Sequence, residues 1–238
     1  MKNTVLRCTS LTAALLVGIV LTFSSCDKDY GPRITETRNT GPFAGIILKG
    51  SSEVEIRYDS ITEVVVETPE EVMNHVENTV SGQNLYIQIN KNFSGGHNTK
   101  IRIKTPALNL VKLDGSGNMT VHDAFGTSTM VSEIDGSGNV RMPMSANKLT
   151  ATISGSGNMT LYGDVDEQSL LVDGSGNIDA FNLISETTNA TISGSGNINV
   201  FASKFLNATI SGSGNIRYKG SPQVSQNISG SGNVSKSN

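Results

Sequence analysis

Polar and apolar residues alternate one by one along much of the chain after residue 105. The segments 151–154, 190–193 and 208–211 all read Ala-Thr-Ile-Ser, and 198–200 reads Ile-Asn-Val. A period of two with many β-branched residues is typical of strands that bury one face. No long stripe of helical periodicity accompanies it. The pattern therefore predicts an all-β domain built from short strands.

The tetrapeptide Gly-Ser-Gly-Asn interrupts this alternation seven times. Its first glycines follow one another at steps of 21, 19, 19, 20, 18 and 18 residues: Gly115, Gly136, Gly155, Gly174, Gly194, Gly212 and Gly230. An apolar residue stands two positions before each of them and directly after each Asn. A repeat of about twenty residues indicates a solenoid whose coils stack and bury these positions. Because parallel crossovers are almost always right-handed, we predict a right-handed parallel β-helix.

We interpret the motif as the corner of each coil. Glycine reaches positive φ without steric cost and lets stacked backbones approach closely. Asparagine side chains placed above one another can bond as a ladder. The predicted structural turn ladder consists of Asn118, Asn139, Asn158, Asn177, Asn197, Asn215 and Asn233.

Three possible binding roles for the motif fit the sequence less well than this role as a scaffold. A phosphate-binding loop needs a following helix and, in the P-loop, a Lys-Ser/Thr pair, and both are missing. A calcium-binding β-roll needs a carboxylate in every turn, whereas an aspartate precedes only three of the seven corners, at Asp114, Asp135 and Asp173. An ice-binding face needs regular ranks of threonine, and Leu171 interrupts them. We therefore predict no metal site and no cofactor.

The N-terminus has the features of a targeting segment. Lys2 and Arg7 precede an apolar run at 11–23 that is too short for a comfortable transmembrane helix. The run LTFSSC at 21–26 resembles a bacterial lipobox, which implies a signal peptide over 1–25 and a lipid on Cys26. An ordinary secretory signal is the alternative. The lipid would anchor the protein to a membrane without spanning it, and 26–42 would form a flexible tether.

Composition narrows the classes of partner and chemistry. Tryptophan is absent, and the chain beyond residue 25 carries 16 basic and 21 acidic residues, a net charge of −5. Without a basic patch, nucleic acid is not an expected partner. Cys8 lies in the signal peptide and Cys26 would be lipidated. The exported domain is therefore predicted to contain no disulfide, thiol nucleophile or thiolate metal site.

The domain itself is predicted to span 43–238. Over 106–238 it consists of the repeat coils, and 43–105 forms a non-repetitive N-terminal β capping region with the first coils. Within that region 48–54 resembles a worn copy of the motif, strands are expected at 53–58, 62–67, 85–89 and 100–104, a hairpin turn at 81–84 and a short helix at 69–76. The C-terminal coil has few edge blockers, which suggests end-to-end self-association.

Catalytic patterns are weak. His75, His97 and His122 have no ligand-like spacing. Because many β-helices are polysaccharide lyases or hydrolases, the enzyme alternative would align Asp114, Asp135 and Asp173 near Lys112 or Arg141. Aspartate before glycine is more simply a turn residue. Aromatic side chains that a sugar-binding surface could use are Tyr162, Phe181, Phe201 and Tyr218.

The lipobox, the opening 43–54, the hairpin at 80–89 and the GNI triplets at 176–178, 196–198 and 214–216 together resemble the auto-transporter adhesin head GIN domain family. The resemblance covers roughly 40–235. It implies a right-handed parallel β-helix on an envelope lipoprotein of Gram-negative bacteria, placed at the outer membrane on its periplasmic or surface side. It implies no catalytic residues and no ligand. We expect a non-enzymatic binding or scaffold module whose partner is a glycan or an extracellular protein.

Overall fold

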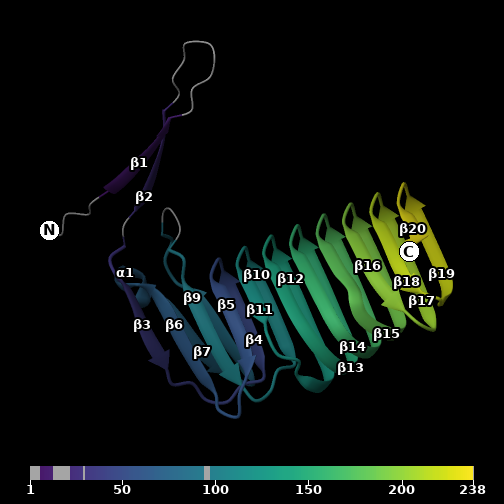
Figure 1. Ribbon diagram of the computed structural model, residues 1–238, viewed down its shortest axis with the longest axis horizontal. Coiled ribbons are helices and arrows are strands. Elements are labelled where there is room, and N and C mark those ends of the chain that lie inside the picture. Colours follow the sequence, from purple (N-terminus) through teal and green to yellow (C-terminus); the bar gives the residue numbers. More distant parts are fainter. Residues whose placement is uncertain (1–5, 13–21, 29, 94–96, 238) are drawn as a thin grey trace.

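The computed structural model describes residues 6–12, 22–28, 30–93 and 97–237, and Figure 1 shows strands stacked side by side along one shaft. Near the N-terminus β1 (Leu6–Thr12) and β2 (Thr22–Lys28) pair antiparallel. The rest of the predicted signal peptide, at 1–5 and 13–21, lies outside the described residues. So does the side chain of Cys26. In the described part of the chain, no helix is long and apolar enough to cross a membrane.

The shaft has two parallel walls that meet at the Gly-Ser-Gly-Asn corners. The first wall, which leads into the corners, contains β4 (Gly45–Gly50), β10 (Leu110–Gly115), β12 (Gly126–Gly136), β17 (Phe205–Gly212) and β19 (Gln223–Gly230). The second wall, which leaves them, contains β5 (Glu53–Tyr58), β11 (Asn118–Val121), β16 (Asn197–Ala202), β18 (Asn215–Gly220) and β20 (Asn233–Lys236). Three longer strands continue through both walls: β13 (Asn139–Gly155), β14 (Asn158–Gly174) and β15 (Asn177–Gly194).

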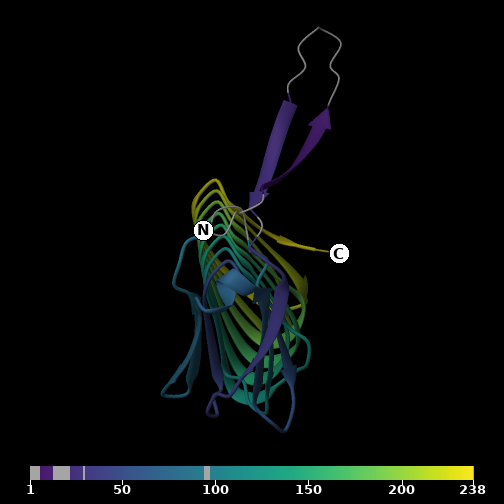
Figure 2. The ribbon, with the colours of Figure 1, turned by 90° about the vertical axis from the view of Figure 1, so that its left-hand side faces the viewer.

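The seven motifs stack in register, which confirms the predicted parallel β-helix. The first glycines pair from coil to coil, from Gly115 with Gly136 through to Gly212 with Gly230. Viewed along the shaft, the coils lie behind one another (Figure 2). The worn copy at 48–54 occupies the same position one coil earlier, because Gly50 pairs with Gly115 and Glu53 with Asn118.

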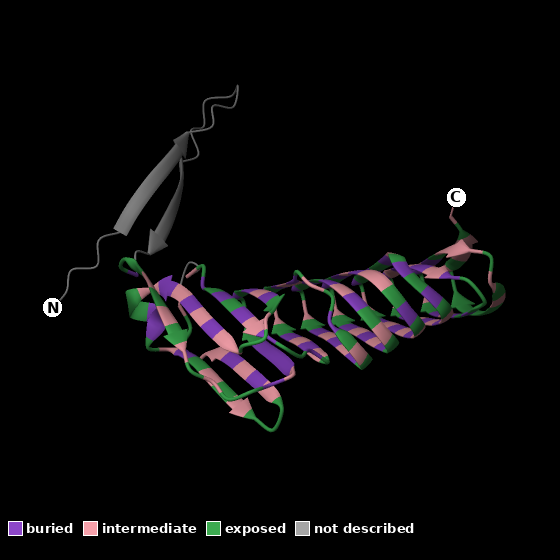
Figure 3. Cartoon of the chain, turned by 60° about the horizontal axis from the view of Figure 1, so that its bottom comes forward, coloured by how far each residue is buried: buried purple, intermediate pink, exposed green. Residues whose placement is uncertain are grey.

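The core is a single apolar layer between the two walls. Burial alternates along the strands, as Figure 3 shows. The apolar residues that flank the motif, such as Ile153, Ile192 and Ile210, are fully buried. At the last coil the equivalent Ile228 is 38% exposed. Each coil therefore depends on its neighbours for burial, as expected for a solenoid.

Both corner glycines are required by the stacking. Gly174 has φ of +129°, and a Cβ there would lie 2.4 Å from the carbonyl oxygen of Gly155 in the preceding coil. Gly176 is buried, and its Cβ would meet the Gly157 oxygen and Ile153 Cγ2 at 2.6 Å each. A side chain at either glycine would push neighbouring coils apart.

An antiparallel cap closes the N-terminal end. β8 (Asn84–Ile89) and β9 (Lys100–Thr105) pair with β4 and β5 and extend the two walls by one coil. On their far sides run β7 (Val76–Ser81), β6 (Glu63–Pro69) and β3 (Arg33–Arg38), all antiparallel to their neighbours. The short helix α1 (Glu70–Met73) buries Val72 and Met73. Antiparallel edges thus replace the free parallel edge of the first coil.

These cap elements match the expected strands, turn and helix to within two or three residues at each end. The hairpin turns at Gly82-Gln83, where Gly82 has φ of +61°. A difference appears upstream. β3 lies within the segment predicted as a flexible tether, and it pairs along its length with β6. The ordered sheet therefore includes residues 33–38, ahead of the predicted domain start at residue 43.

Candidate functional site

The asparagines of the motif lie on the outside of the corner. Five side-chain hydrogen bonds of 2.8–3.1 Å, each from Nδ2 to the Oδ1 of the preceding coil, join Asn118 through Asn215. No such bond joins Asn233 to Asn215 in the described residues. Because the amides hydrogen-bond to one another, few of their polar atoms along this row remain free to bind a ligand.

We expect this ladder to contribute to stability. Replacing Asn158, Asn177 and Asn197 with alanine removes four of the five bonds and should lower the free energy of unfolding by about 2 kcal/mol, because an exposed hydrogen bond contributes about 0.5 kcal/mol. Urea denaturation measures the difference. The matched control replaces three asparagines outside the ladder, Asn182, Asn199 and Asn227. If both triple variants unfold at the same urea concentration, the ladder has no stabilising role.

The corner aspartates meet only one of the two basic residues named beside them: besides Glu133, which acts most strongly, the charges of Asp135 and Asp114 also raise the pKa of Lys112. Asp114 and Asp135 are register neighbours, but Ser154 separates Asp135 from Asp173. Lys112 donates a hydrogen bond of 2.6 Å to Glu133, which raises the pKa of Lys112. Arg141 projects from the second wall, whereas all three aspartates stand on the first. The described residues therefore offer no acid pair with a free cation here.

The histidines are also dispersed. His75 and His97 belong to the cap, where their Nδ1 atoms lie 3.1 Å from Asn90 Oδ1 and 2.7 Å from Thr99 Oγ1. Burial lowers the pKa of His97. His122 lies 3.8 Å from Glu55. No group of three His, Cys, Asp or Glu residues suited to a metal ion occurs in the described ranges.

Three of the four candidate aromatic residues share one surface. Tyr162, Phe181 and Phe201 project outward from the second wall in three successive coils, and each is half-buried. Tyr218 differs because it points inward and packs against the core. A register shift between Thr160 and Tyr162 against β15 lets both Phe181 and Asn182 face outward. Tyr162 pairs with Asn182 rather than with Phe181, so the three rings form a row on successive coils without strict register.

Cationic side chains border this row. The guanidinium carbon of Arg141 lies 5.1 Å from the ring centre of Tyr162, and Lys219 Nζ lies 4.7 Å from that of Phe181. Such distances are typical of cation–π contacts. We call Arg141, Tyr162, Phe181, Phe201 and Lys219 together the aromatic face.

A hollow adjoins the aromatic face, two residues nearer the corner on the same strands. It encloses about 280 Å³ and is lined mainly by Asp179, Asn199, Arg217 and the ladder amides Asn177, Asn197 and Asn215. Asp179, Asn199 and Arg217 stand in register on successive coils. The surface therefore combines flat rings with planar hydrogen-bonding groups. We call this the polar hollow.

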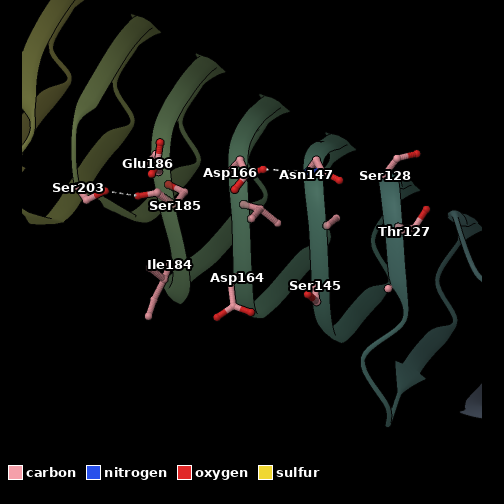
Figure 4. Close-up of a pocket in the computed structure, with 13 residues that line it drawn as sticks. Thr127, Ser128, Ser145, Asn147, Asp164, Asp166, Ile184, Ser185, Glu186 and Ser203 are labelled. Carbon is pink, nitrogen blue, oxygen red and sulfur yellow. Dashed lines mark hydrogen bonds between the residues drawn. The ribbon is translucent and has the colours of Figure 1, made fainter.

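A larger and more open groove lies at the opposite corner of the coils. It encloses about 730 Å³ and crosses five coils, with Asp164, Asp166, Glu186, Asn147 and several hydroxyls on its walls (Figure 4). Asn147 Nδ2 donates a hydrogen bond of 3.0 Å to Asp166, and Lys204 Nζ lies 2.6 Å from a carboxylate oxygen of Glu186. Two of the three carboxylates are therefore already engaged. Ile184, which is 55% exposed, adds an apolar patch. We call this the corner groove.

Sequence reasoning missed the corner groove and the polar hollow. The residues of the corner groove follow no repeated motif, so the sequence holds no signal that they share a corner. Arg217 and Asn199 do carry a signal, since each stands two positions after a motif asparagine. That offset places both on the outward side of the second wall.

The comparisons with known proteins agree on the fold. The sequence matches the family described as "Putative auto-transporter adhesin, head GIN domain" over residues 42–222. No match was found among curated proteins. A crystal structure from Bacteroides fragilis, described as a "putative adhesin", is similar with a TM-score of 0.82 and 26% sequence identity. The alignment covers 86% of this chain and 97% of that one.

Two structures from Parabacteroides distasonis are also similar. One is described as a "Putative lipid binding protein" and has a TM-score of 0.74 at 26% identity, with 87% of this chain and 98% of that one covered. The other is described as a "putative adhesin" and has a TM-score of 0.74 at 22% identity, with 88% and 98% covered. At 22% identity the second of these shows the fold alone.

Proposed function

The chain belongs to the auto-transporter adhesin head GIN domain family, and on that premise we propose that it is an adhesin-like binding module of the cell envelope. The relatives named as adhesins support a binding role. Fold alone does not specify function, so the proposal has to rest on a particular surface of this chain.

The ligand in this proposal is a glycan that lies on the aromatic face. The observation that carries it is the row Tyr162, Phe181 and Phe201, three rings that project outward on successive coils. Most other outward positions of these strands bear Ser, Thr, Asn or charged residues. Exposed rings stack on the apolar C–H face of a sugar, and the neighbouring amides supply donors and acceptors for its hydroxyls. Coils about 4.8 Å apart would present these contacts repeatedly along an extended chain.

The proposal includes anchoring through lipid on Cys26. Several acyl chains on one residue would hold the protein firmly at the envelope. The shaft would then present the aromatic face at a distance from the membrane. The lipobox-like run at 21–26 and the match to an adhesin family support this part of the proposal.

We propose a non-enzymatic role because the aspartates of the enzyme alternative are not arranged as a reactive group. Ser154 separates Asp135 from Asp173, and Lys112 is paired with Glu133. Acid–base catalysis of glycoside cleavage requires two carboxyl groups on either side of one bond. A row of turn residues on a single wall does not place two carboxyl groups on either side of a bound glycosidic bond.

The test is glycan binding by the purified full-length chain and by Phe181→Leu and Phe201→Leu variants. Leucine keeps most of the apolar cover over the strands but removes the flat ring. We expect each variant to lose about tenfold in affinity for the glycans that the wild type binds, since one stacked ring contributes about 1 kcal/mol or more. Binding is measured by glycan array and then by calorimetry.

Phe205→Leu is the matched control. Phe205 is 49% exposed on the first wall, away from the aromatic face, so its ring should be irrelevant to binding. Equal binding by all three variants and the wild type would remove the aromatic face as the site.

A further inference from the structure

We propose that the glycan held by the aromatic face is acidic, a polysaccharide that carries carboxylate or sulfate groups. The inference rests on the proposed function, because it specifies the ligand class of that same surface. Its basis is the distribution of charge between the two walls.

Between residues 110 and 220, the basic residues of the two walls differ in their partners. On the first wall and the corner groove, Lys112, Lys148 and Lys204 each form an ion pair with a carboxylate of the adjacent coil, at 2.6, 3.5 and 2.6 Å. Arg141, Arg217 and Lys219 of the second wall form no ion pair within the described residues. The chain as a whole carries a net negative charge, so unpaired cations gathered on one face are not explained by composition.

Positive charge dominates the outward side of this wall from each motif asparagine to the position of the rings, four residues later. Besides the three cations, the outward positions there contain one carboxylate, Asp179, while Asp164 stands two residues beyond Tyr162 in the corner groove. Asp179 Oδ1 accepts a hydrogen bond of 3.3 Å from the backbone N–H of Phe181, so this acid is used locally where the strand bulges. An anionic ligand would therefore meet three cations that form no ion pair in the described residues, and one engaged carboxylate.

The cations stand where an anionic sugar on the rings would place its charged groups. Arg141 lies over Tyr162, at one end of the aromatic row, and Lys219 lies over Phe181, its middle ring. Arg217 lines the polar hollow beside it, together with the free amide of Asn199. A guanidinium can bind a carboxylate or sulfate through two parallel hydrogen bonds. Because these cations lie over one face of Tyr162 and Phe181, the ring surface they leave open, together with Phe201, would hold the sugar backbone while Arg141, Arg217 and Lys219 hold its acidic substituents.

The experiment compares polysaccharides that differ in charge on one backbone. Unmodified dextran, carboxymethyl-dextran and dextran sulfate of equal length, with polygalacturonate as a natural uronate, are titrated against the full-length chain. We expect binding to the acidic polymers and at least tenfold weaker binding to dextran. Arg141→Gln combined with Lys219→Gln should weaken binding of the acidic polymers at least tenfold, since it removes two charge-assisted contacts.

Lys148→Gln combined with Lys204→Gln is the control, because it removes the same charge from paired lysines elsewhere. Its affinity should stay within about twofold of the wild type. An equal loss in both double variants would show unspecific attraction and overturn the inference. Vesicles of phosphatidylglycerol test a lipid surface as the alternative ligand, and binding to them but to no polysaccharide would also overturn it.

The outcomes separate the two proposals. If neutral glycans bind as well as acidic ones and Arg141→Gln with Lys219→Gln has no effect, the acidic ligand is wrong while the aromatic face remains a glycan site. If Phe181→Leu binds every polymer as the wild type does, the proposed function itself fails.

Discussion

Replacing Gly174 with alanine is expected to lower the free energy of unfolding by about 3 kcal/mol. Two costs add at this position. The backbone φ of +129° is one that an L side chain rarely adopts, and the new Cβ would lie 2.4 Å from the Gly155 oxygen. That oxygen accepts the N–H groups of Ser175 and Gly176, so moving it also weakens two hydrogen bonds between coils. Thermal and urea unfolding of the purified variant measure the loss.

Gly126→Ala is the matched control for Gly174→Ala. Gly126 also lies in a strand of the first wall, but no atom lies within 4 Å of its Cβ position and its φ is not in the left-handed range. Alanine there should be neutral or slightly stabilising, because it reduces the freedom of the unfolded chain. Two equal melting temperatures would contradict the view that close stacking of coils requires the corner glycines.

Replacing Gln168 with alanine is also expected to lower the free energy of unfolding by about 3 kcal/mol. Gln168 is fully buried, and its Nε2 lies 2.9 Å from Ser185 Oγ, 2.9 Å from Thr188 Oγ1 and 3.1 Å from the Phe201 oxygen. Alanine would leave a cavity between coils and remove the donor that joins three of them. The change is measured by urea denaturation.

Gln168→Met should be close to neutral, which separates volume from hydrogen bonding. Methionine has a similar length, and the column of inward residues that it would join contains Leu149 on one side and, beyond Thr188, Leu206 on the other. Ser185 Oγ would still donate to the Phe201 oxygen at 2.7 Å, and Gln168 Oε1 has no partner to lose. A loss for Gln168→Met as large as that for Gln168→Ala would show that the amide, not the packing, holds these coils together.

The repeat made the shaft predictable from the sequence. Each Gly-Ser-Gly-Asn marks a corner, and the flanking alternation fixes which side chains face inward. The cap was predictable only in pieces, since its strands were visible but their antiparallel order was not. β3 was missed because its alternation, Arg33–Arg38, bears few apolar residues and lies beside Gly31 and Pro32.

The aromatic face could be predicted only in part from the sequence. Tyr162, Phe181 and Phe201 each stand four positions after a motif asparagine, an even offset that indicates the outward side, whereas Tyr218 stands three positions after Asn215. Whether the offset from the motif asparagine is even or odd would by itself have distinguished the three outward rings from the inward Tyr218. The approach of Lys219 to Phe181 was not accessible, because it joins two coils that are not adjacent and depends on where a long side chain lies.

The most direct test of a glycan-binding aromatic face is the footprint of a bound ligand. Hydrogen–deuterium exchange of the full-length chain is compared with and without polygalacturonate. Binding at the aromatic face predicts slower exchange at 158–162, 177–182 and 197–201, the segments that bear the rings, and no change at 145–147 or 164–166 in the corner groove. Protection confined to the corner groove, or found nowhere, would contradict the account.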